Sequence, residues 1–567
     1  MTARTVGGKS DQTLTNPEET PAMGSQTHSA PPPPINEPIL DYAPGSPERA
    51  DLTTELVRQS SEVVEIPLII GGKEIRTEET FDVTMPHAHN HVLAHCHVGT
   101  EVEAQAAITA SAEAWRDWSE WSLEERVAIL LRASALLEDS WRTKLNAATM
   151  LGQSKTSFQA EVDAACELID FWRFNSHFAS KVHAHQPVSS PGMWNRIDHR
   201  PLEGFIYAIS PFNFTAIGGN LTTSAALMGN VVIWKPSTTG VLASYYVMKL
   251  LEEAGMPPGV INFIPGQASR ISDVLLSSPD LAGIHFTGST QTFQHLWKSV
   301  ADNLENYRSY PRLVGETGGK DFILAHESAD PQAVAVAIVR GGFEYQGQKC
   351  SAVSRVYIPD TIWEEVIERA TAMTKDLKVG DPSDFQNFMG AVIDRKAFDS
   401  IKSYIEHAKN STDVEILAGG GCDDSVGYFI EPTLVATDKP DHKMMCEEIF
   451  GPVVTMFRYS ASAWGDTLKL VDETSPYALT GAVFSRDRNA IREANTVLRH
   501  AAGNYYINDK PSGAVVGQQP FGGSRASGTN DKAGSVLNLQ RWVSPRTIKE
   551  TFNPPLDYRY PFMEADQ

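Results

Sequence analysis

The chain has 567 residues, a formal net charge of −22 and an ordinary globular composition, with 41% hydrophobic and 21% charged residues. Its length predicts several domains with a large core, and no apolar run approaches the roughly 18 residues that a membrane-spanning helix needs. The acidic balance argues against nucleic acid as the main partner, because binding to phosphates requires a basic face.

The first 36 residues are poor in large apolar side chains and contain Pro31–Pro34, a proline run that favours an extended polyproline conformation. We expect a disordered lead or a targeting segment. A mitochondrial presequence is rich in arginine and poor in acids. This segment carries Arg4 and Lys9 but also Asp11 and Glu18, so its composition alone does not favour mitochondrial import.

A helical pattern runs from Glu101 to Phe178, where apolar residues recur at helical spacing. An acidic stretch in this block contains Glu161, Asp163 and Glu167, and we expect it to form a solvated helix face. Cys96 and Cys166 are expected to be small buried hydrophobes.

After Gly204 the pattern changes to short apolar runs separated by glycine and by helical stretches. Buried parallel strands are predicted at Phe205–Ser210, Val231–Lys235, Ile261–Ile264 and Gly283–Thr287, with crossover helices at Thr222–Met228 and Ala243–Ala254. This alternation predicts a doubly wound nucleotide-binding half. A second alternating block runs from about Asp321 to Leu498 and is interpreted as a catalytic domain.

The usual GxGxxG fingerprint is absent after the first predicted strand, and a different junction offers itself as a phosphate site. Phe286-Thr287-Gly288-Ser289-Thr290 ends a strand and opens a helix. Free N–H groups at a helix N-terminus can receive pyrophosphate. By itself this is a weak signal, because a plain tight turn has the same composition.

Two segments further along the chain predict covalent chemistry. Cys350 lies in the polar segment Gly347-Gln348-Lys349-Cys350-Ser351, a setting expected to leave the thiol open to attack a substrate. Glu316 lies 34 residues earlier, inside Gly315-Glu316-Thr317-Gly318. A carboxylate and a cysteine in glycine-rich loops predict a general base and a nucleophile. The chain has five cysteines and no CxxC pair, which fits a reducing compartment and predicts no structural zinc or other metal site.

From about Pro38 to the C-terminus, the order of these motifs resembles the aldehyde dehydrogenase superfamily. The motifs that carry the resemblance are Ser210-Pro211-Phe212-Asn213-Phe214-Thr215, Trp234-Lys235-Pro236-Ser237, Phe286-Thr287-Gly288-Ser289-Thr290, Glu447-Glu448-Ile449-Phe450-Gly451-Pro452 and Gln519-Pro520-Phe521-Gly522-Gly523. The resemblance implies an α/β fold with two doubly wound parallel-sheet domains and a small antiparallel oligomerisation sheet. The expected limits are 1–36 for the lead, 37–314 with returning segments near 500–530 for the NAD-binding domain, 315–498 for the catalytic domain, and 535–567 for the oligomerisation strand and tail.

The family also implies roles for individual residues. Cys350 attacks an aldehyde, the Asn213 amide and the Cys350 backbone N–H stabilise the oxyanion, and Glu316 activates water to cleave the thioester. The implied NAD-binding residues are Ser210, Lys235, Gly288, Ser289, Thr290, Gln291, Thr292, Glu448 and Phe450. Among them, Lys235 contacts the adenosine ribose, Glu448 the nicotinamide ribose, and Phe450 the nicotinamide. Many NAD-dependent relatives have an acid shortly after the Lys-Pro pair, and Ser237-Thr238-Thr239 at this place leaves NADP use open.

The stretch from Gly204 to Lys235 and the tail from Gly517 to Asp531 resemble the eukaryotic branch that oxidises L-glutamate γ-semialdehyde, the second step of proline catabolism. The implied substrate residues are Ser351, Gly513 and Ala514 for the carboxylate, with Phe212 and Phe521 packed on the aliphatic stem. The family often has serine where this chain has Ala514. The resemblance further implies a homodimer or higher homo-oligomer, transient contact with proline dehydrogenase, and the mitochondrial matrix, with the cytoplasm as the alternative.

Two competing hypotheses remain at this stage. One is an aldehyde dehydrogenase with another substrate, such as a different semialdehyde or a fatty aldehyde. The other is a catalytically idle paralogue that acts as a binding protein, which the intact Asn213, Glu316 and Cys350 disfavour.

Overall fold

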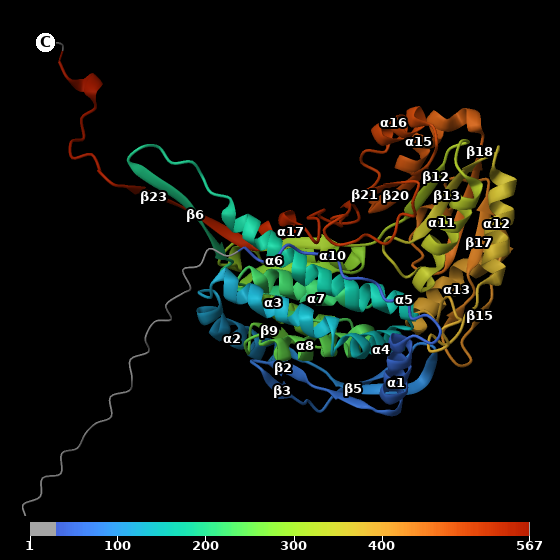
Figure 1. The fold of residues 1–567 in the computed structure, drawn as a ribbon, viewed down its shortest axis with the longest axis horizontal. Helices are drawn as coiled ribbons and strands as arrows, with labels where there is room; N and C mark the ends of the chain where they lie inside the picture. The colour runs from blue at the N-terminus through green and yellow to red at the C-terminus, as the bar shows by residue number, and fades with distance from the viewer. Residues whose placement is uncertain (1–29, 566–567) are drawn as a thin grey trace, which may run out of the picture.

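The computed structural model describes residues 30–565, and Figure 1 shows two lobes with a two-stranded arm that projects from the first. The disordered lead was expected at residues 1–36, and residues 1–29 of it lie outside the described part of the chain. Residues 30–36 form neither a helix nor a strand, and the Asn36 side chain donates to Asp170 Oδ2 at 2.7 Å. Within the described residues, no helix combines the length and apolarity needed to cross a bilayer.

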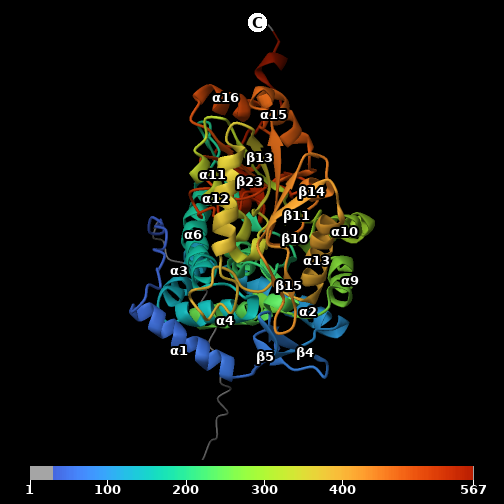
Figure 2. The ribbon, with the colours of Figure 1, turned by 90° about the vertical axis from the view of Figure 1, so that its right-hand side faces the viewer.

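The first lobe is built on a seven-stranded sheet in the order β11-β10-β7-β8-β9-β2-β3. These strands are β2 (Leu68–Ile70), β3 (Lys73–Ile75), β7 (Phe205–Ile209), β8 (Val231–Lys235), β9 (Ile261–Phe263), β10 (Leu281–Thr287) and β11 (Arg312–Glu316). The five strands from β11 to β9 run parallel, which confirms the prediction, and β2 and β3 add an antiparallel edge. All residues of β8 and β10 are buried because helices cover both faces of the sheet, as Figure 2 shows for α10 on one side and α6 on the other.

The second lobe contains another seven-stranded sheet, in the order β14-β17-β18-β13-β12-β20-β21. Its strands are β12 (Asp321–Ala325), β13 (Val353–Pro359), β14 (Val414–Ala418), β17 (Thr433–Thr437), β18 (Val453–Tyr459), β20 (Thr480–Phe484) and β21 (Asn504–Ile507). Only β14 pairs antiparallel. The sheets do not divide at the expected limits, since β11 crosses residue 314 and β21 extends the second sheet beyond residue 498.

Small sheets of two or three strands complete the fold. The strands β1 (Val64–Ile66), β5 (Ala88–His97) and β4 (Thr80–Met85) form one sheet, and β15 (Cys422–Asp423) with β16 (Phe429–Ile430) and β19 (Tyr477–Ala478) with β22 (Ser524–Arg525) form two more. The arm of Figure 1 pairs β6 (Met193–Pro201) with β23 (Val543–Thr551) along their whole length. Two parallel-sheet lobes and a small antiparallel sheet confirm the expected fold class.

Helices fill the connections between the strands. They are α1 (Pro47–Ser61), α2 (Glu101–Trp118), α3 (Leu123–Glu138), α4 (Arg142–Gln153), α5 (Ser157–Ala160), α6 (Leu168–Ala184), α7 (Thr215–Leu227), α8 (Val241–Ala254), α9 (Ala268–Ser277), α10 (Thr290–Asp302), α11 (Pro331–Phe343), α12 (Trp363–Asp376), α13 (Arg395–Asn410), α14 (Lys443–Cys446), α15 (Trp464–Glu473), α16 (Arg488–Val497) and α17 (Val536–Gln540). The crossover helix α8 ends at Gly255, whose φ of 98° suits glycine, as expected. By contrast, α7 begins seven residues before the predicted start, because Gly218 and Gly219 weaken the local helical signal.

In the acidic stretch of residues 161–167, Glu161 and Asp163 are buried and Glu167 is half-buried, so the prediction of a solvated face is wrong. The stretch forms a π-helical turn, η1 (Glu161–Glu167), between α5 and α6. Glu161 pairs with Arg142, and Asp163 pairs with Lys155. Arg142 begins α4 and Lys155 follows it, and their charges make burial of the acids tolerable. Cys96 and Cys166 are buried, as predicted.

Candidate active site

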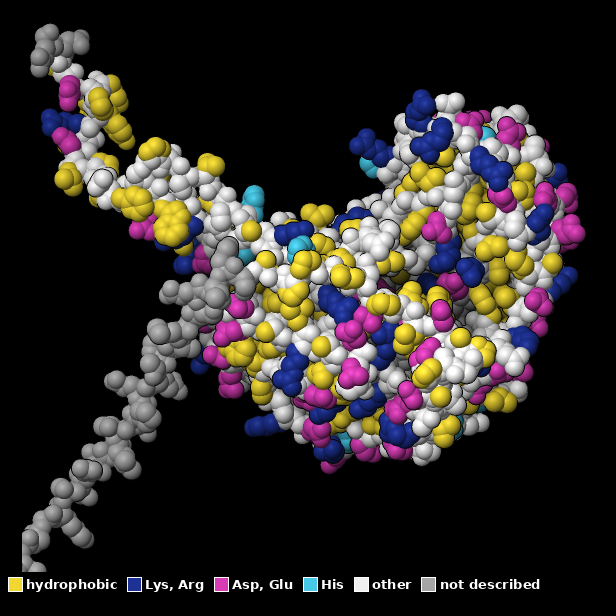
Figure 3. Space-filling model, viewed as in Figure 1, with side chains coloured by type: hydrophobic (Ala, Val, Ile, Leu, Met, Phe, Trp, Pro, Cys, Tyr) yellow, Lys and Arg dark blue, Asp and Glu magenta, His cyan; other side chains and the backbone are white. Residues whose placement is uncertain are grey.

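The expected nucleophile and base lie side by side where the two lobes meet. Glu316 is the last residue of β11, and Cys350 follows the short helix η4 (Glu344–Gly347) of the second lobe. The Cys350 thiol donates to Glu316 Oε1 at a Sγ–O distance of 3.5 Å. Figure 3 shows the molecular surface hollowed between the lobes. Strand ends of parallel sheets are where ligands of such folds bind.

An unusual backbone presents Cys350 to this junction. Tyr345, Gln346 and Gly347 have φ angles of 52°, 56° and 64°, so three consecutive residues adopt the left-handed region. A Cβ on Gly347 would lie 2.2 Å from the carbonyl oxygen of Gly451, which makes glycine necessary there. The Gln346 amide stabilises the loop by donating to two buried carbonyls, those of Ser154 at 2.9 Å and Ala391 at 2.7 Å. Strained backbone of this kind persists where surrounding contacts fix it.

Burial decides the protonation of the catalytic pair. Cys350 is only 9% exposed, so the expectation of an open thiol is wrong, although its side chain borders a cavity. Burial and the neighbouring Glu316 carboxylate raise the pKa of Cys350 well above its ordinary value. Burial also raises the pKa of Glu316, to about 7. At neutral pH the resting proton therefore lies on sulfur, and Glu316 is poised to accept it.

Asn213 reaches the nucleophile loop from the first lobe. It lies between β7 and α7, and its Nδ2 donates to the Gln348 carbonyl at 3.0 Å. The side chain is buried, 4% exposed. This contact fixes the Asn213 amide against the loop that carries Cys350. Its N–H groups are suited to stabilise the oxyanion that forms when the sulfur attacks a carbonyl carbon.

A cavity beside Cys350 and Glu316 can hold a small substrate. Its wall includes the aromatic rings of Phe171, Phe214 and Phe521, and its polar groups include Ser351, Gly513, Ala514, Glu167, Asn220 and Lys532. Phe212, which was expected to pack on the substrate, is not part of this wall. Its ring instead contacts Phe450 edge-on, with centroids 6.0 Å apart. The ring that reaches the cavity is that of Phe214, the residue directly before α7.

Lys235 and Ser210, which are expected to bind NAD, lie at the carboxyl ends of strands of the first sheet. Lys235 ends β8, and its buried ammonium donates only to Pro236 O, at 3.2 Å, among the described residues. Burial lowers its pKa to about 8. Ser210 follows β7 and accepts from the Trp234 indole at 2.9 Å. A buried lysine with a single acceptor has N–H groups left for a ribose hydroxyl.

The pyrophosphate junction and the nicotinamide side also have suitable geometry. Ser289 caps α10, where its Oγ accepts from Thr292 N at 3.2 Å, and Thr290 and Gln291 form the first turn. Gly288 allows the close turn, since a Cβ there would lie 2.7 Å from the Phe286 ring. Glu448 accepts from Gly319 N at 2.8 Å, and burial raises its pKa to about 7. Phe450, with a φ of 56°, lies two residues further on. These groups fit a dinucleotide.

The model of the aldehyde dehydrogenase family matches residues 74–548. The chain belongs to this family. It is 51% identical to the mitochondrial Δ1-pyrroline-5-carboxylate dehydrogenase of Dictyostelium discoideum over 535 residues, which cover 94% of this chain and 96% of that protein. The human mitochondrial enzyme of the same name is 49% identical over 530 residues, covering 93% and 94%. The crystal structure of the Δ-pyrroline-5-carboxylate dehydrogenase from Mycobacterium tuberculosis bound with NAD is 52% identical, has a TM-score of 0.93, and covers 95% of this chain and all of that one (100%).

Two residues of this aldehyde dehydrogenase site were missed by sequence reasoning. Glu167 was assigned to a solvated face, yet it borders the cavity, and burial raises its pKa well above the ordinary value. Lys532 contacts the Gly503 and Gly522 carbonyls at 2.8 and 2.9 Å, and its charge counteracts the effect of burial on Glu316. Neither position carries a local motif. For Glu167, the one sequence feature that could have indicated a site role is the absence of a basic residue nearby in the chain.

Proposed function

We propose that the protein oxidises L-glutamate γ-semialdehyde, the open form of Δ1-pyrroline-5-carboxylate, to L-glutamate with NAD. The observation that carries the proposal is the cavity that joins the Cys350–Glu316 pair to Glu167 and to the Gly513–Ala514 segment. The substrate carries an α-ammonium and an α-carboxylate, and both need partners when they are buried. Glu167 supplies a carboxyl group whose charged form the substrate ammonium would favour, and Ser351 with backbone N–H groups supplies donors. The names of the relatives support the same substrate.

The reaction starts at the catalytic pair. Glu316 accepts the thiol proton of Cys350, and the sulfur then attacks the aldehyde carbon. Asn213 Nδ2 and the Cys350 backbone N–H hold the oxyanion that forms. Bound NAD would supply the hydride acceptor with which this adduct is oxidised to a thioester. Glu316, after passing on its proton, removes a proton from water, and the resulting hydroxide releases glutamate and restores the thiol.

NAD is the proposed cofactor, with Lys235, Glu448 and the first turn of α10 as its contacts. The Mycobacterium tuberculosis relative, whose crystal structure is bound with NAD, supports this choice. The chain lacks an acid at Ser237 that would repel a 2′-phosphate. Comparing kcat/KM for NAD and NADP measures how strict the preference is.

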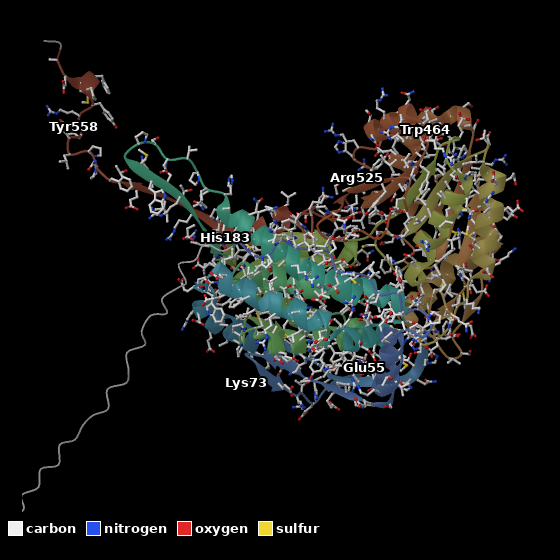
Figure 4. The ribbon with its side chains drawn as sticks, in the orientation of Figure 1. Glu55, Lys73, His183, Trp464, Arg525 and Tyr558 are labelled. Atoms are coloured by element: carbon white, nitrogen blue, oxygen red, sulfur yellow. The ribbon has the colours of Figure 1, made fainter. Side chains whose placement is uncertain are left out.

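The exposed arm and tail support assembly of this chain with itself. Hydrophobic side chains gather on both in Figure 3, and Tyr558 lies on the tail beyond the arm in Figure 4. Trp194, Phe552 and Phe562 are 52%, 59% and 82% exposed. Large exposed apolar patches mark interaction sites. We therefore assign the arm and residues 535–567 to a homodimer or higher homo-oligomer, which light scattering tests.

The relatives also support a location and a partner enzyme for this chain. Several carry the word mitochondrial in their names, and this supports the matrix as the site of action, with the cytoplasm as the alternative. A chain titled proline utilization A is 28% identical over a region that covers 91% of this chain and 53% of that one. It supports a transient contact with proline dehydrogenase, which would supply the substrate.

The test of the function is NADH formation from Δ1-pyrroline-5-carboxylate beside a panel of uncharged and other charged aldehydes. We expect the highest kcat/KM for pyrroline-5-carboxylate. A higher value for a fatty aldehyde or for another semialdehyde would replace the proposed substrate. Absence of activity with every aldehyde would favour the idle paralogue.

Replacing Glu167 by glutamine is expected to raise KM for the semialdehyde by about 10- to 100-fold, because the substrate ammonium loses a buried counter-charge. Propionaldehyde has no ammonium and serves as the control substrate, whose kcat/KM should change little. Steady-state kinetics with both aldehydes decides. Equal losses for the two would remove Glu167 from ammonium recognition.

Replacing Ala514 by serine is expected to lower KM for the semialdehyde by about 3- to 10-fold, because the new hydroxyl can donate to the substrate carboxylate. The matched control is Ala514→Cys, which adds a similar volume with a weak donor. An unchanged KM in the serine variant would place the carboxylate elsewhere in the cavity.

A further inference from the structure

A buried ion pair, whose Asp163 borders the cavity, takes no part in the reaction steps derived above. Lys155 follows α4, Asp163 belongs to η1, and Lys155 Nζ lies 2.5 Å from Asp163 Oδ2. Each side chain is 1% exposed. A buried pair is costly unless its remaining lone pairs and protons are also satisfied. The partners that satisfy this pair therefore indicate what it holds in place.

Asp163 serves as the N-terminal cap of α7. Its Oδ2 accepts from Thr215 N at 3.0 Å and its Oδ1 from Ala216 N at 2.9 Å. The local cap residue, Phe214, offers no side-chain acceptor. A carboxylate at this end fixes the first turn through hydrogen bonds and the helix dipole. Asn213 lies only two residues before the first helical residue, so its position depends on this cap.

Lys155 lies between the two segments that carry the oxyanion donor and the nucleophile. Its ammonium is 4.3 Å from the ring centre of Phe214, next to Asn213, and 4.5 Å from that of Tyr345, in the nucleophile loop. Cation–π contacts of this kind are strongest when they are desolvated. The preceding carbonyl, that of Ser154, accepts from the Gln346 amide in the same loop. One buried cation thus contacts both sides of the catalytic junction.

We infer that Lys155 and Asp163 are positioning residues that hold the Asn213 amide against the nucleophile loop. The Asn213 Nδ2 donates to Gln348 O at 3.0 Å, and this contact joins the segment after β7 to the loop that bears Cys350. A misplacement of a donor by about 1 Å can cost about 100-fold in rate. This inference rests on the proposed function, because it assigns the oxyanion to Asn213.

A double-mutant cycle tests the inference. Asp163→Asn keeps the size of the side chain and removes its charge and one backbone acceptor. In the parent enzyme we expect kcat to fall about 10- to 100-fold with little change in KM for NAD. In the Asn213→Ala background the same substitution should change kcat less than about twofold, because the donor that it misplaces is already absent. Equal fold losses in both backgrounds would overturn the inference.

The matched control is Glu161→Gln. Glu161 is buried on the same η1 turn and pairs with Arg142, but its contacts are to Leu40, Tyr42 and Asn146 and not to α7. Both single variants should lower the unfolding temperature, and only Asp163→Asn should lower kcat by tenfold or more. An equal loss of kcat in Glu161→Gln would show a general effect of destabilisation and would overturn the positioning role.

A second variant covers the case in which Asp163→Asn does not fold. Lys155→Met/Asp163→Asn removes both charges and leaves no unpaired buried ion. The same cycle with Asn213→Ala is then measured, with the same two outcomes. Failure of the proposed function is a separate result, because the parent itself would then form no NADH from pyrroline-5-carboxylate, and the cycle would be scored with the aldehyde that the parent does oxidise.

Discussion

Cys350→Ala is expected to abolish NADH formation, with a loss of about 10⁵-fold or more, the scale seen when a covalent nucleophile is removed. The Sγ atom is the only sulfur that borders the cavity among the described residues, and it contacts the proposed base directly. No neighbouring side chain can replace it, since Ser351 is a much weaker nucleophile. The measurement is NADH absorbance with pyrroline-5-carboxylate at saturating NAD.

The matched control for this prediction is Cys96→Ala. Cys96 is also a buried thiol, but it lies on β5 outside the cavity, and burial raises its pKa above the ordinary value as well. The control should keep its activity within about twofold of the parent. Retention of more than a few per cent of activity in Cys350→Ala would require another nucleophile and would contradict the mechanism.

The parts of the structure that sequence reasoning predicted correctly depend on local patterns. The run Val231–Lys235 is mostly apolar and rich in β-branched residues, and this composition alone predicts a buried strand. Gly255 ends α8 because a left-handed residue after a helix favours glycine. Glycine-bounded Glu316 and Cys350 stand out for the same reason, since short segments determine their setting.

The errors concern contacts between residues that are distant in sequence. Nothing near Asp163 shows that its carboxylate will cap α7, 52 residues away. Burial of Cys350 likewise depends on how the lobes meet and not on its polar neighbours. The choice between Phe212 and Phe214 turns on which side of the chain faces the cavity after β7 ends. The sequence shows only that the η1 segment is acidic. Whether its carboxylates face solvent or pair with buried cations depends on tertiary packing.

Glu316→Gln is expected to lower kcat by about 10²- to 10⁴-fold and to remove the acid limb of the pH profile. Burial raises the pKa of Glu316 to about 7, so the parent should gain activity as pH rises through this value. Below it the carboxyl is protonated and can accept a proton from neither the Cys350 thiol nor water. Glutamine accepts none at any pH, so the variant should lack the inflection near pH 7, and its residual rate should instead follow the small thiolate fraction of Cys350, which rises with pH without levelling off.

Glu448 provides the control for this assignment, because burial raises its pKa to about 7 as well. Its carboxylate accepts from Gly319 N and is assigned to the cofactor, so Glu448→Gln should raise KM for NAD and keep the acid limb of kcat. The kcat profile of both variants between pH 5.5 and 9 separates the two carboxylates. If the limb persists in Glu316→Gln and disappears in Glu448→Gln, the base is Glu448 and the order of proton transfers proposed above is wrong. If the limb disappears only in Glu316→Gln, one carboxylate accepts both the thiol proton and the water proton. This double role explains why Glu316, the last residue of β11, contacts the Cys350 sulfur.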